Sequence, residues 1–268
     1  MPESLIFEIR DRVAYVTFST PERLNSVDER RLGDLDDVVT ALEGNDELVA
    51  AVFTGQGKAF CVGLDKDLLK RAFGDMDYFG DVIRRYNDIL NRIEELPMPT
   101  LAVVNGYARA GGIELALACD IIIISDSALI GDNHTHYGVM PGGGSTQRLP
   151  RRVGEQRAKE LIWSARWLNA DEAVDCGLAL MSAPADSLAE NVEEFLASFR
   201  DKPRAVLEVV KRTIHGGRDL PVRDGVEVEI AAFKHYMGEL PYAREGFAAS
   251  MENRRPGWLA DEDSEDDA

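Results

Sequence analysis

The sequence is poor in cysteine. It has three, Cys61, Cys119 and Cys176, among 268 residues, and no two of them form a CxxC pair. An odd number of widely spaced thiols argues against the disulfide framework of a small secreted protein and indicates a reducing compartment. Each cysteine lies among small apolar residues, so buried structural thiols are expected rather than catalytic ones.

Long apolar runs are also absent. A transmembrane helix needs roughly 18 or more consecutive apolar residues, whereas the longest run here, around IIII at 121–124, has the length of a strand. The N-terminus, MPESLIFEIRDR, has no basic segment followed by an apolar one and therefore does not read as a signal peptide. These absences predict a cytoplasmic protein without a membrane partner.

Lysine is scarce, with seven among the 30 basic residues, and the net charge is −18. Without the six acids of the terminal DEDSEDDA the charge is still −12. An acidic, lysine-poor surface suits a high-salt cytoplasm, where screening reduces self-repulsion. No basic face or stripe is present, which argues against nucleic acid as a partner.

What the chain does contain is an alternation of strand-like and helix-like segments in its first 200 residues. LIFEI and VAYVTFS predict an opening β-hairpin, and a capping box at Ser26-Val-Asp-Glu29 predicts a helix to about residue 43. Further strands are expected at LVAAVFTG, TLAVVNG and IIIIS, and helices at 75–96 and in GGIELALACD. Strands that are apolar on both faces belong in a covered sheet, so the class is α/β.

The C-terminal part has a different pattern, with helical segments at 203–216, 222–238 and 242–254 and no strand between them. We therefore expect an α/β core over 1–200, a helical region over 201–258 and an acidic tail over 259–268 that has no reason to fold. Apart from the tail, the sequence shows no low-complexity segment, and it shows no internal repeat.

The stretch NGYARAGGIELALACD contains the first chemical signal. Gly111 and Gly112 follow a strand and open an apolar helix, whose unpaired N–H groups can hold an oxyanion or a phosphate. Glu114 lies inside this apolar helix, where a carboxylate is costly unless it is paired or acts as an acid or base. A carboxylate turned outward to solvent is the alternative.

Two further glycine-rich segments lack the common phosphate-binding patterns. GQGKAFCVGLDKDLL has neither a GK[ST] ending nor GxGxxG spacing, but Gly63 could present the N–H of Leu64 toward the same cleft. PGGGSTQRLP fails both patterns as well and does not match the GxSxG elbow of serine hydrolases.

Five ordered segments together resemble the enoyl-CoA hydratase/isomerase (crotonase) superfamily over about residues 5–258. They are PERLNSV, GKAFCVGLD, AVVNGYARAGGIELALACD, GVMPGGGSTQRLPRRVG and REGFAASMENRRPGW. The resemblance implies a crotonase-type spiral of ββα turns with a C-terminal helical region, assembled as a homotrimer or a dimer of trimers. It also implies an acyl-CoA thioester as the substrate, with CoA as part of it, and no separate cofactor.

The resemblance assigns roles to four residues. The backbone N–H groups of Leu64 and Gly111 form the oxyanion hole, and Glu114 matches the first catalytic glutamate of the hydratases. The second glutamate of the family should lie 20 residues later, where this chain has His134. An imidazole can accept or donate a proton near neutral pH, so hydration stays chemically possible although the motif no longer implies it.

The segment GDNHTHYG around His134 allows two other interpretations. Asp132, His134 and His136 could imitate a metal site if the segment were extended, but no fourth ligand is apparent and the family needs no metal. Asp132 fits better as a carboxylate that orients His134 and raises its pKa. A plain hydrogen-bonded loop histidine is the remaining interpretation.

Substrate binding is assigned by the resemblance alone. Arg23, Lys58 and Lys66 lie on segments that border the CoA site of relatives, and solvated surface charge is the alternative for each. Family lysines that contact CoA are replaced here by Asp67 and Asn253, which leaves the 3′-phosphate contacts open. The helical segment between 66 and 96 is expected to line the acyl pocket. The other residues expected beside the substrate are Cys61, Val62, Asp65, Gly112, Pro141 and Gly142.

Three functions follow from these observations. The leading one is reversible hydration of 2-enoyl-CoA in fatty acid metabolism. Isomerisation of an enoyl-CoA, or hydrolysis of an acyl-CoA or β-dicarbonyl compound, is the second, because the same scaffold supports these reactions in relatives. The third is a non-catalytic protein that binds CoA or RNA. Glu114 and the glycines argue against a non-catalytic CoA-binding protein, and the acidic charge argues against an RNA-binding protein.

Overall fold

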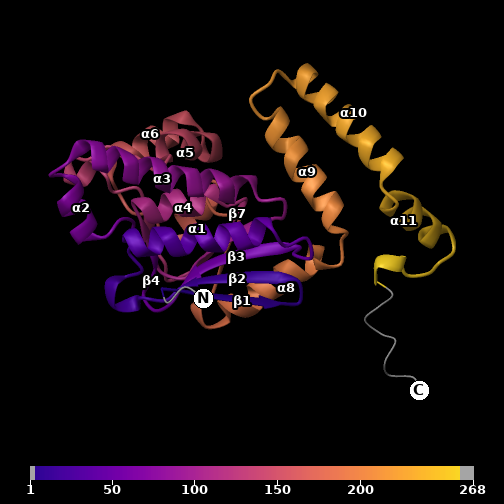
Figure 1. Ribbon diagram of the computed structural model, residues 1–268, viewed down its shortest axis with the longest axis horizontal. Coiled ribbons are helices and arrows are strands. Elements are labelled where there is room, and N and C mark those ends of the chain that lie inside the picture. The colour runs from indigo at the N-terminus through magenta and orange to yellow at the C-terminus, as the bar shows by residue number, and fades with distance from the viewer. Residues whose placement is uncertain (1–3, 260–268) are drawn as a thin grey trace. The chain divides into compact units, whose positions relative to one another are not determined.

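The computed structural model of the chain describes residues 4–259. Internal contacts divide the chain into two compact units, with the boundary between Leu196 and Ala197. The first unit contains both sheets of the protein and the second is helical (Figure 1). The sequence predicts this division slightly later, between residues 200 and 201.

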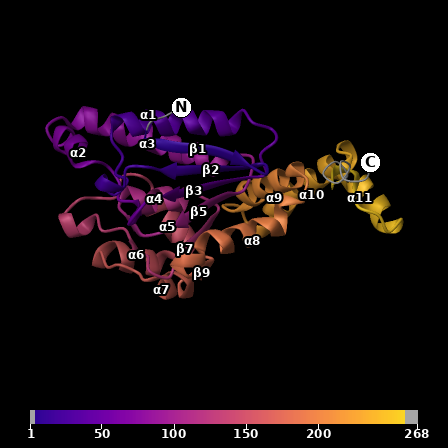
Figure 2. The same ribbon diagram turned by 90° about the horizontal axis from the view of Figure 1, so that it is seen from below.

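A six-stranded sheet runs through the first unit in the order β1-β2-β3-β5-β7-β9, seen from top to bottom in Figure 2. The predicted hairpin of β1 and β2 is confirmed, and every other neighbouring pair of strands is parallel. Parallel neighbours need crossover connections, and these bring helices onto the sheet. The strands are β1 Leu5–Arg10, β2 Val13–Phe18, β3 Ala50–Gly55, β5 Thr100–Val104, β7 Ile121–Ser125 and β9 Met181–Ala183.

A second sheet consists of three short parallel strands, β4 Ala59–Cys61, β6 Tyr107–Arg109 and β8 Ile130–Gly131. Each follows the strand before it from the large sheet and precedes a helix. The chain therefore repeats a ββα turn, and the predicted crotonase-type spiral is confirmed. The repeat is one of backbone topology, which is why the amino-acid sequence shows none.

One expectation about the helices needs correction. Helix α1 begins at Glu29, where the N-cap is Asp28, whose carboxylate accepts a hydrogen bond from the N–H of Arg31 at 2.8 Å. The capping box predicted from Ser26 is wrong, because the Ser26 hydroxyl donates instead to Asp65 at 2.9 Å. The helix predicted over 75–96 is confirmed as α3, and a shorter helix, α2, precedes it. The helices are α1 Glu29–Glu43, α2 Lys66–Ala72, α3 Met76–Glu95, α4 Gly111–Ala118, α5 Ser145–Val153, α6 Glu155–Ser164, α7 Ala170–Asp175 and α8 Leu188–Arg200.

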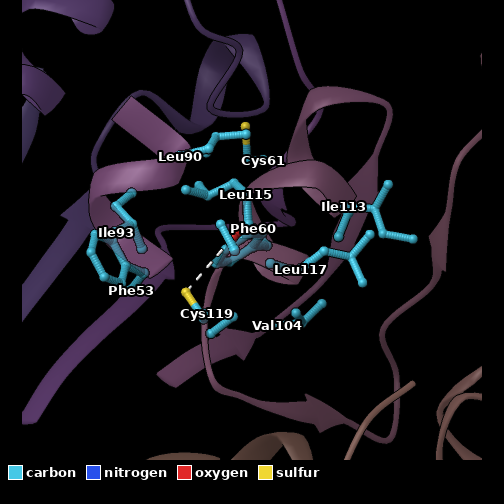
Figure 3. Close-up of a cluster of buried hydrophobic side chains, with 14 of the residues drawn as sticks. Phe53, Phe60, Cys61, Leu90, Ile93, Val104, Ile113, Leu115, Leu117 and Cys119 are labelled. Carbon is cyan, nitrogen blue, oxygen red and sulfur yellow. Dashed lines mark hydrogen bonds between the residues drawn. The ribbon is translucent and has the colours of Figure 1, made fainter. Parts of the chain in front are cut away.

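The core of the first unit surrounds α4, which is buried along its whole length. Apolar side chains of β3, β4, α3 and α4 meet there, as Figure 3 shows. Burial of one such side chain stabilises a fold by roughly 1.5–3 kcal/mol. The labelled residues are Phe53, Phe60, Cys61, Leu90, Ile93, Val104, Ile113, Leu115, Leu117 and Cys119. A helix held this firmly is a rigid base for the groups that it carries.

The second unit contains the predicted C-terminal helices, which are confirmed as α9 Arg204–Gly217, α10 Val222–Glu239 and α11 Tyr242–Met251. Helix α10 has no buried residue, although its sequence is amphipathic. The expected acidic tail, 259–268, lies outside the described residues apart from its first position. Among residues 4–259, no helix combines the length and the apolar character needed to span a membrane.

Candidate active site

The first unit contains a cavity of about 580 Å³. Helices α2 and α3 with the residues next to them supply mainly apolar lining, called here the apolar wall, and β6, the start of α4 and the segment 133–142 supply the other wall. The lining residues are Val62, Leu64, Lys66, Leu69, Phe73, Phe79, Ile83, Tyr86, Arg109, Ala110, Gly111, Glu114, Asn133, His134, Tyr137, Val139, Met140 and Gly142. All four residues predicted to be catalytic border this one space.

Glu114 enters the cavity from the first turn of α4 and is 2% exposed. Its Oε1 accepts hydrogen bonds from the N–H groups of Gly143 at 2.7 Å and Ser145 at 3.2 Å. Burial raises the pKa of Glu114 to about 6, against the opposing effects of the His134 charge and these N–H donors. A carboxylate that titrates near neutral pH suits general acid–base catalysis. The interpretation of Glu114 as a solvated surface carboxylate is wrong.

The glycine run after His134 holds Glu114. A Cβ atom on Gly143 would lie 2.3 Å from Glu114 Oε2, so only glycine fits there. Gly144 has φ +102°, which also favours glycine. The turn is fixed from α3, where the Asn87 side chain donates to the carbonyl of Gly142 at 2.7 Å. The segment PGGG is therefore a cradle for a carboxylate.

His134 follows β8 and is paired with Asp132, as predicted. The Nδ1 atom of His134 lies 2.9 Å from Oδ1 of Asp132, and the same oxygen accepts the backbone N–H of His134 at 3.3 Å. Burial lowers the pKa of His134, but the Asp132 hydrogen bond and the Glu114 charge outweigh it, and the net shift is upward. With Nδ1 held by Asp132, Nε2 is the nitrogen available to a ligand in the cavity.

The predicted oxyanion donors lie at the closest approach of two chain segments. Gly63 has φ +85°, and a Cβ atom on it would lie 2.6 Å from the nitrogen of Gly111. A bridge between Val27 and Leu64 fixes the first segment. Within residues 4–259, the N–H groups of Leu64 and Gly111 donate no backbone hydrogen bond. Two such donors at the wall of a cavity are what a developing oxyanion requires.

Tyr86 of α3 supports the oxyanion hole and was not foreseen from the sequence. Its hydroxyl donates to the carbonyl of Gly111 at 2.5 Å, and its side chain is 1% exposed. Burial holds the pKa of Tyr86 well above its ordinary value, so the hydroxyl keeps its proton and remains a donor. In the sequence, Tyr86 is only one of several apolar positions on an amphipathic helix.

Some of the residues predicted to bind substrate lie in this cavity. Val62, Lys66 and Gly142 line it. Lys58 and Lys66 are exposed and Pro141 is buried, and of these three only Lys66 borders the cavity. Lys66 is the first residue of α2 and lies beside the apolar wall.

Two of the predicted contacts belong to the core. Cys61 is fully buried, and its carbonyl oxygen would lie 1.9 Å from a Cβ atom on Gly112. Burial raises the pKa of the Cys61 thiol to about 11, so it is protonated and unreactive. Neither residue lines the cavity, and the absence of a side chain at Gly112 lets helix α4 pack directly on β4.

Asp65 and Arg23 also have structural partners. The Asp65 side chain accepts the N–H of Asp67 and thereby caps α2, and it accepts the hydroxyl of Ser26. Arg23 forms an ion pair with Asp65 at 3.5 Å, and neither residue borders the cavity. The aspartate of the GLD segment thus positions the loop that carries Leu64.

The segment 66–96, expected to line an acyl pocket, contributes apolar residues to this cavity, whereas the sequence does not single out Arg109 or Tyr137. Phe73 and Phe79 form an edge-to-face pair with ring centres 5.4 Å apart on the apolar wall. Arg109 donates to the hydroxyl of Tyr137 at 3.2 Å on the other wall. Residues two apart in a strand point to the same face. The position of Arg109 two residues before Gly111 therefore indicates that both approach the same cavity.

A metal site is not supported at His134. His136 is exposed and packs edge-to-face on Tyr137, with ring centres 4.9 Å apart. Between residues 4 and 259 there is no group of three or more His, Cys, Asp or Glu side chains that could hold a metal ion. The segment GDNHTHYG therefore presents a single oriented imidazole.

Two backbone N–H donors, a buried carboxylate and an oriented imidazole around one cavity define an enzyme that stabilises an oxyanion and moves protons. Comparison with known proteins agrees. The sequence profile of the family described as enoyl-CoA hydratase/isomerase matches residues 8–261. The chain belongs to the enoyl-CoA hydratase/isomerase family.

Individual relatives match along nearly their whole length. A short-chain-enoyl-CoA hydratase of Clostridium acetobutylicum is 32% identical over 86% of this chain and 88% of its own. A crotonyl-CoA hydratase of Syntrophomonas wolfei is 28% identical over 96% of this chain and 98% of its own. The crystal structure of an enoyl-CoA hydratase from Bacillus anthracis superposes with a TM-score of 0.90 at 30% identity, covering 95% of this chain and 98% of that one.

Proposed function

We propose that this chain reversibly hydrates 2-enoyl-CoA to 3-hydroxyacyl-CoA, with Glu114 and His134 as the acid–base pair. The observation that carries the proposal is that both side chains line the cavity into which the N–H groups of Leu64 and Gly111 open. Hydratases named for enoyl-CoA and crotonyl-CoA are among its relatives.

The reaction follows from these positions. The thioester oxygen accepts hydrogen bonds from Leu64 and Gly111, which stabilise the enolate that forms when water attacks the β-carbon. Glu114 takes a proton from the attacking water, and Nε2 of His134 supplies a proton to the α-carbon. Proton transfer from Glu114 to His134 then restores the pair. Loss of either donor of the oxyanion hole costs about 3 kcal/mol of barrier.

Because His134 stands in place of a second carboxylate, a different reaction on the same scaffold is the second candidate function. The same oxyanion hole serves double-bond isomerisation or thioester hydrolysis, and His134 can act as a base in either. CoA is part of the substrate in each case, and we propose no separate cofactor and no nucleic-acid partner.

We also propose a homotrimer or a dimer of trimers in a high-salt cytoplasm. On α10, the exposed apolar residues Val222, Val226, Ile230, Phe233 and Met237 recur every three or four positions and thus share one face. Such a stripe favours contact with another subunit. The scarcity of lysine and the charge of −18 support the high-salt host.

The test uses crotonyl-CoA with the full-length protein in high-salt buffer. The absorbance of the conjugated thioester and the free thiol are followed in parallel. Loss of absorbance without thiol release is the expected result. Thiol release would indicate a hydrolase. No change in either signal with crotonyl-CoA or a longer 2-enoyl-CoA would contradict hydration and favour isomerisation.

A further inference from the structure

Arg109 lines the cavity, yet the hydration mechanism does not use it. It is the last residue of β6 and precedes Gly111 by two residues, so the two Cα atoms are at most about 7 Å apart. Its side chain shares the polar wall with Asn133, His134 and Tyr137. The backbone of Arg109 is therefore close to the N–H group proposed to hold the thioester oxygen, and its charged side chain lines the same cavity.

The guanidinium of Arg109 has few partners of its own. It donates to the Tyr137 hydroxyl and lies over the Tyr137 ring, with Cζ 6.0 Å from the ring centre. No carboxylate of residues 4–259 forms an ion pair with Arg109, although the chain has 48 acids against 30 bases. By contrast, Arg23 and Arg148 are each paired with an acid. Arginine has five N–H donors, so most of them remain for a ligand.

Apolar residues that line the same cavity would hold the carbon chain of the ligand. Leu69, Phe73, Phe79 and Ile83 form an apolar surface from α2 and α3. A cavity with one apolar wall and one arginine fits an acyl group that is apolar along its length and carries an anion. Planar carboxylates match the fork of a guanidinium and can accept two of its hydrogen bonds.

We propose that Arg109 binds a carboxylate carried by the acyl group, so that this site takes 2-enoyl-CoA thioesters of dicarboxylic acids. The inference rests on the proposed function and specifies its substrate class. The phosphates of CoA are the other anions that could reach an arginine. They lie beyond the pantetheine arm, however, whereas Arg109 is beside the residue that holds the thioester oxygen.

The test measures binding of saturated thioesters by calorimetry, with the full-length protein. Glutaryl-CoA ends in a carboxylate, and 5-methylhexanoyl-CoA has an isopropyl group of the same shape in its place. Wild type should bind glutaryl-CoA at least tenfold more tightly. Arg109→Met should abolish or reverse this preference while leaving the affinity for 5-methylhexanoyl-CoA within about twofold. Arg109→Lys should keep a weaker preference, because it retains the charge without the fork.

The matched control is Arg84→Met, which removes an exposed arginine of α3 that is paired only with Asp81. It should bind both thioesters as wild type does. Equal affinity of wild type for the two thioesters would overturn the proposal. So would an equal loss for both in Arg109→Met, which would assign Arg109 to the CoA phosphates. Neither thioester has a double bond, so this result does not depend on whether the protein hydrates crotonyl-CoA.

Discussion

Gly63 and Gly111 pack backbone against backbone, and a Cβ atom on Gly63 would lie 2.6 Å from the nitrogen of Gly111. The contact sets the separation between Gly111 and Leu64, the residue that follows Gly63. The proposed oxyanion hole therefore depends on the absence of a side chain at Gly63, and not on any side chain that could be recognised as catalytic.

Gly63→Ala should lower kcat on crotonyl-CoA by about 10²-fold or more, because the loop carrying Leu64 must move away from Gly111. The left-handed φ of Gly63 adds strain for alanine. Gly80→Ala on α3 is the control, since nothing lies within 4 Å of its added Cβ. It should retain the wild-type rate. A Gly63→Ala enzyme as fast as wild type would remove this contact from the mechanism.

Glu114→Gln should abolish turnover and leave the affinity for a saturated acyl-CoA nearly intact. It should also change how stability depends on pH. The pKa of Glu114 is raised to about 6 in the folded state, so the stabilisation that comes with its proton is complete below the unfolded value of about 4.5 and is lost as pH rises through 6. Chemical denaturation across this range should show the loss in wild type and not in Glu114→Gln. Turnover by the variant would contradict the assignment.

The rate should follow a bell-shaped pH profile, because hydration needs Glu114 ionised and His134 protonated. Activity should rise near pH 6 with Glu114 and fall above the raised pKa of His134. Asp132→Asn removes a cause of that raised pKa, so the falling limb should move to lower pH. Initial rates of crotonyl-CoA hydration between pH 5 and 9 test this. An unmoved falling limb would mean that His134 does not supply the proton.

His134→Ala should lower the rate by about 10²-fold or more if the imidazole transfers a proton. His136→Ala is the matched control on the same segment, because the His136 ring is exposed and does not line the cavity, although it packs on Tyr137. Comparison of kcat for the two variants separates catalysis from loop structure. Equal, small effects would make His134 a structural residue of the loop.

Phe233→Glu should dissociate the oligomer, because Phe233 is 61% exposed in the middle of the apolar stripe on α10. Light scattering coupled to size exclusion would report the mass in high salt. Asp224→Asn, on the same helix but on the face away from the stripe, should leave the mass unchanged. A Phe233→Glu protein of wild-type mass would exclude this stripe as the subunit contact.

The residues predicted to be catalytic all line one cavity, and local motifs fix the positions of several of them. Glu114 and Gly111 lie on one short helix, and Asp132 and His134 are two residues apart. The prediction of the spiral fold rests mainly on the family resemblance, because a ββα repeat without repeated residues leaves no signal in composition or periodicity.

What the sequence does not predict depends on distant partners. Tyr86 reaches Gly111 from another helix, and Arg109 of β6 meets Tyr137 of the segment that follows β8. The same reason explains the errors. Cys61 and Asp65 lie within a substrate-binding motif, but packing on Gly112 and capping of α2 account for them. A motif predicts which segment lies near the ligand. Tertiary contacts decide which side chains of that segment face the ligand and which face the rest of the protein.

The proposed active-site groups come from two separate parts of the chain. The segments 63–64 and 110–111 contain the N–H groups proposed to bind the thioester oxygen. The imidazole and both N–H donors to Glu114 come from the single stretch 132–145. Replacement of that stretch alone would change the groups that transfer protons and leave the proposed oxyanion hole unaltered. This chain, with His134 where the family resemblance predicts a second glutamate, has the form expected of such an exchange.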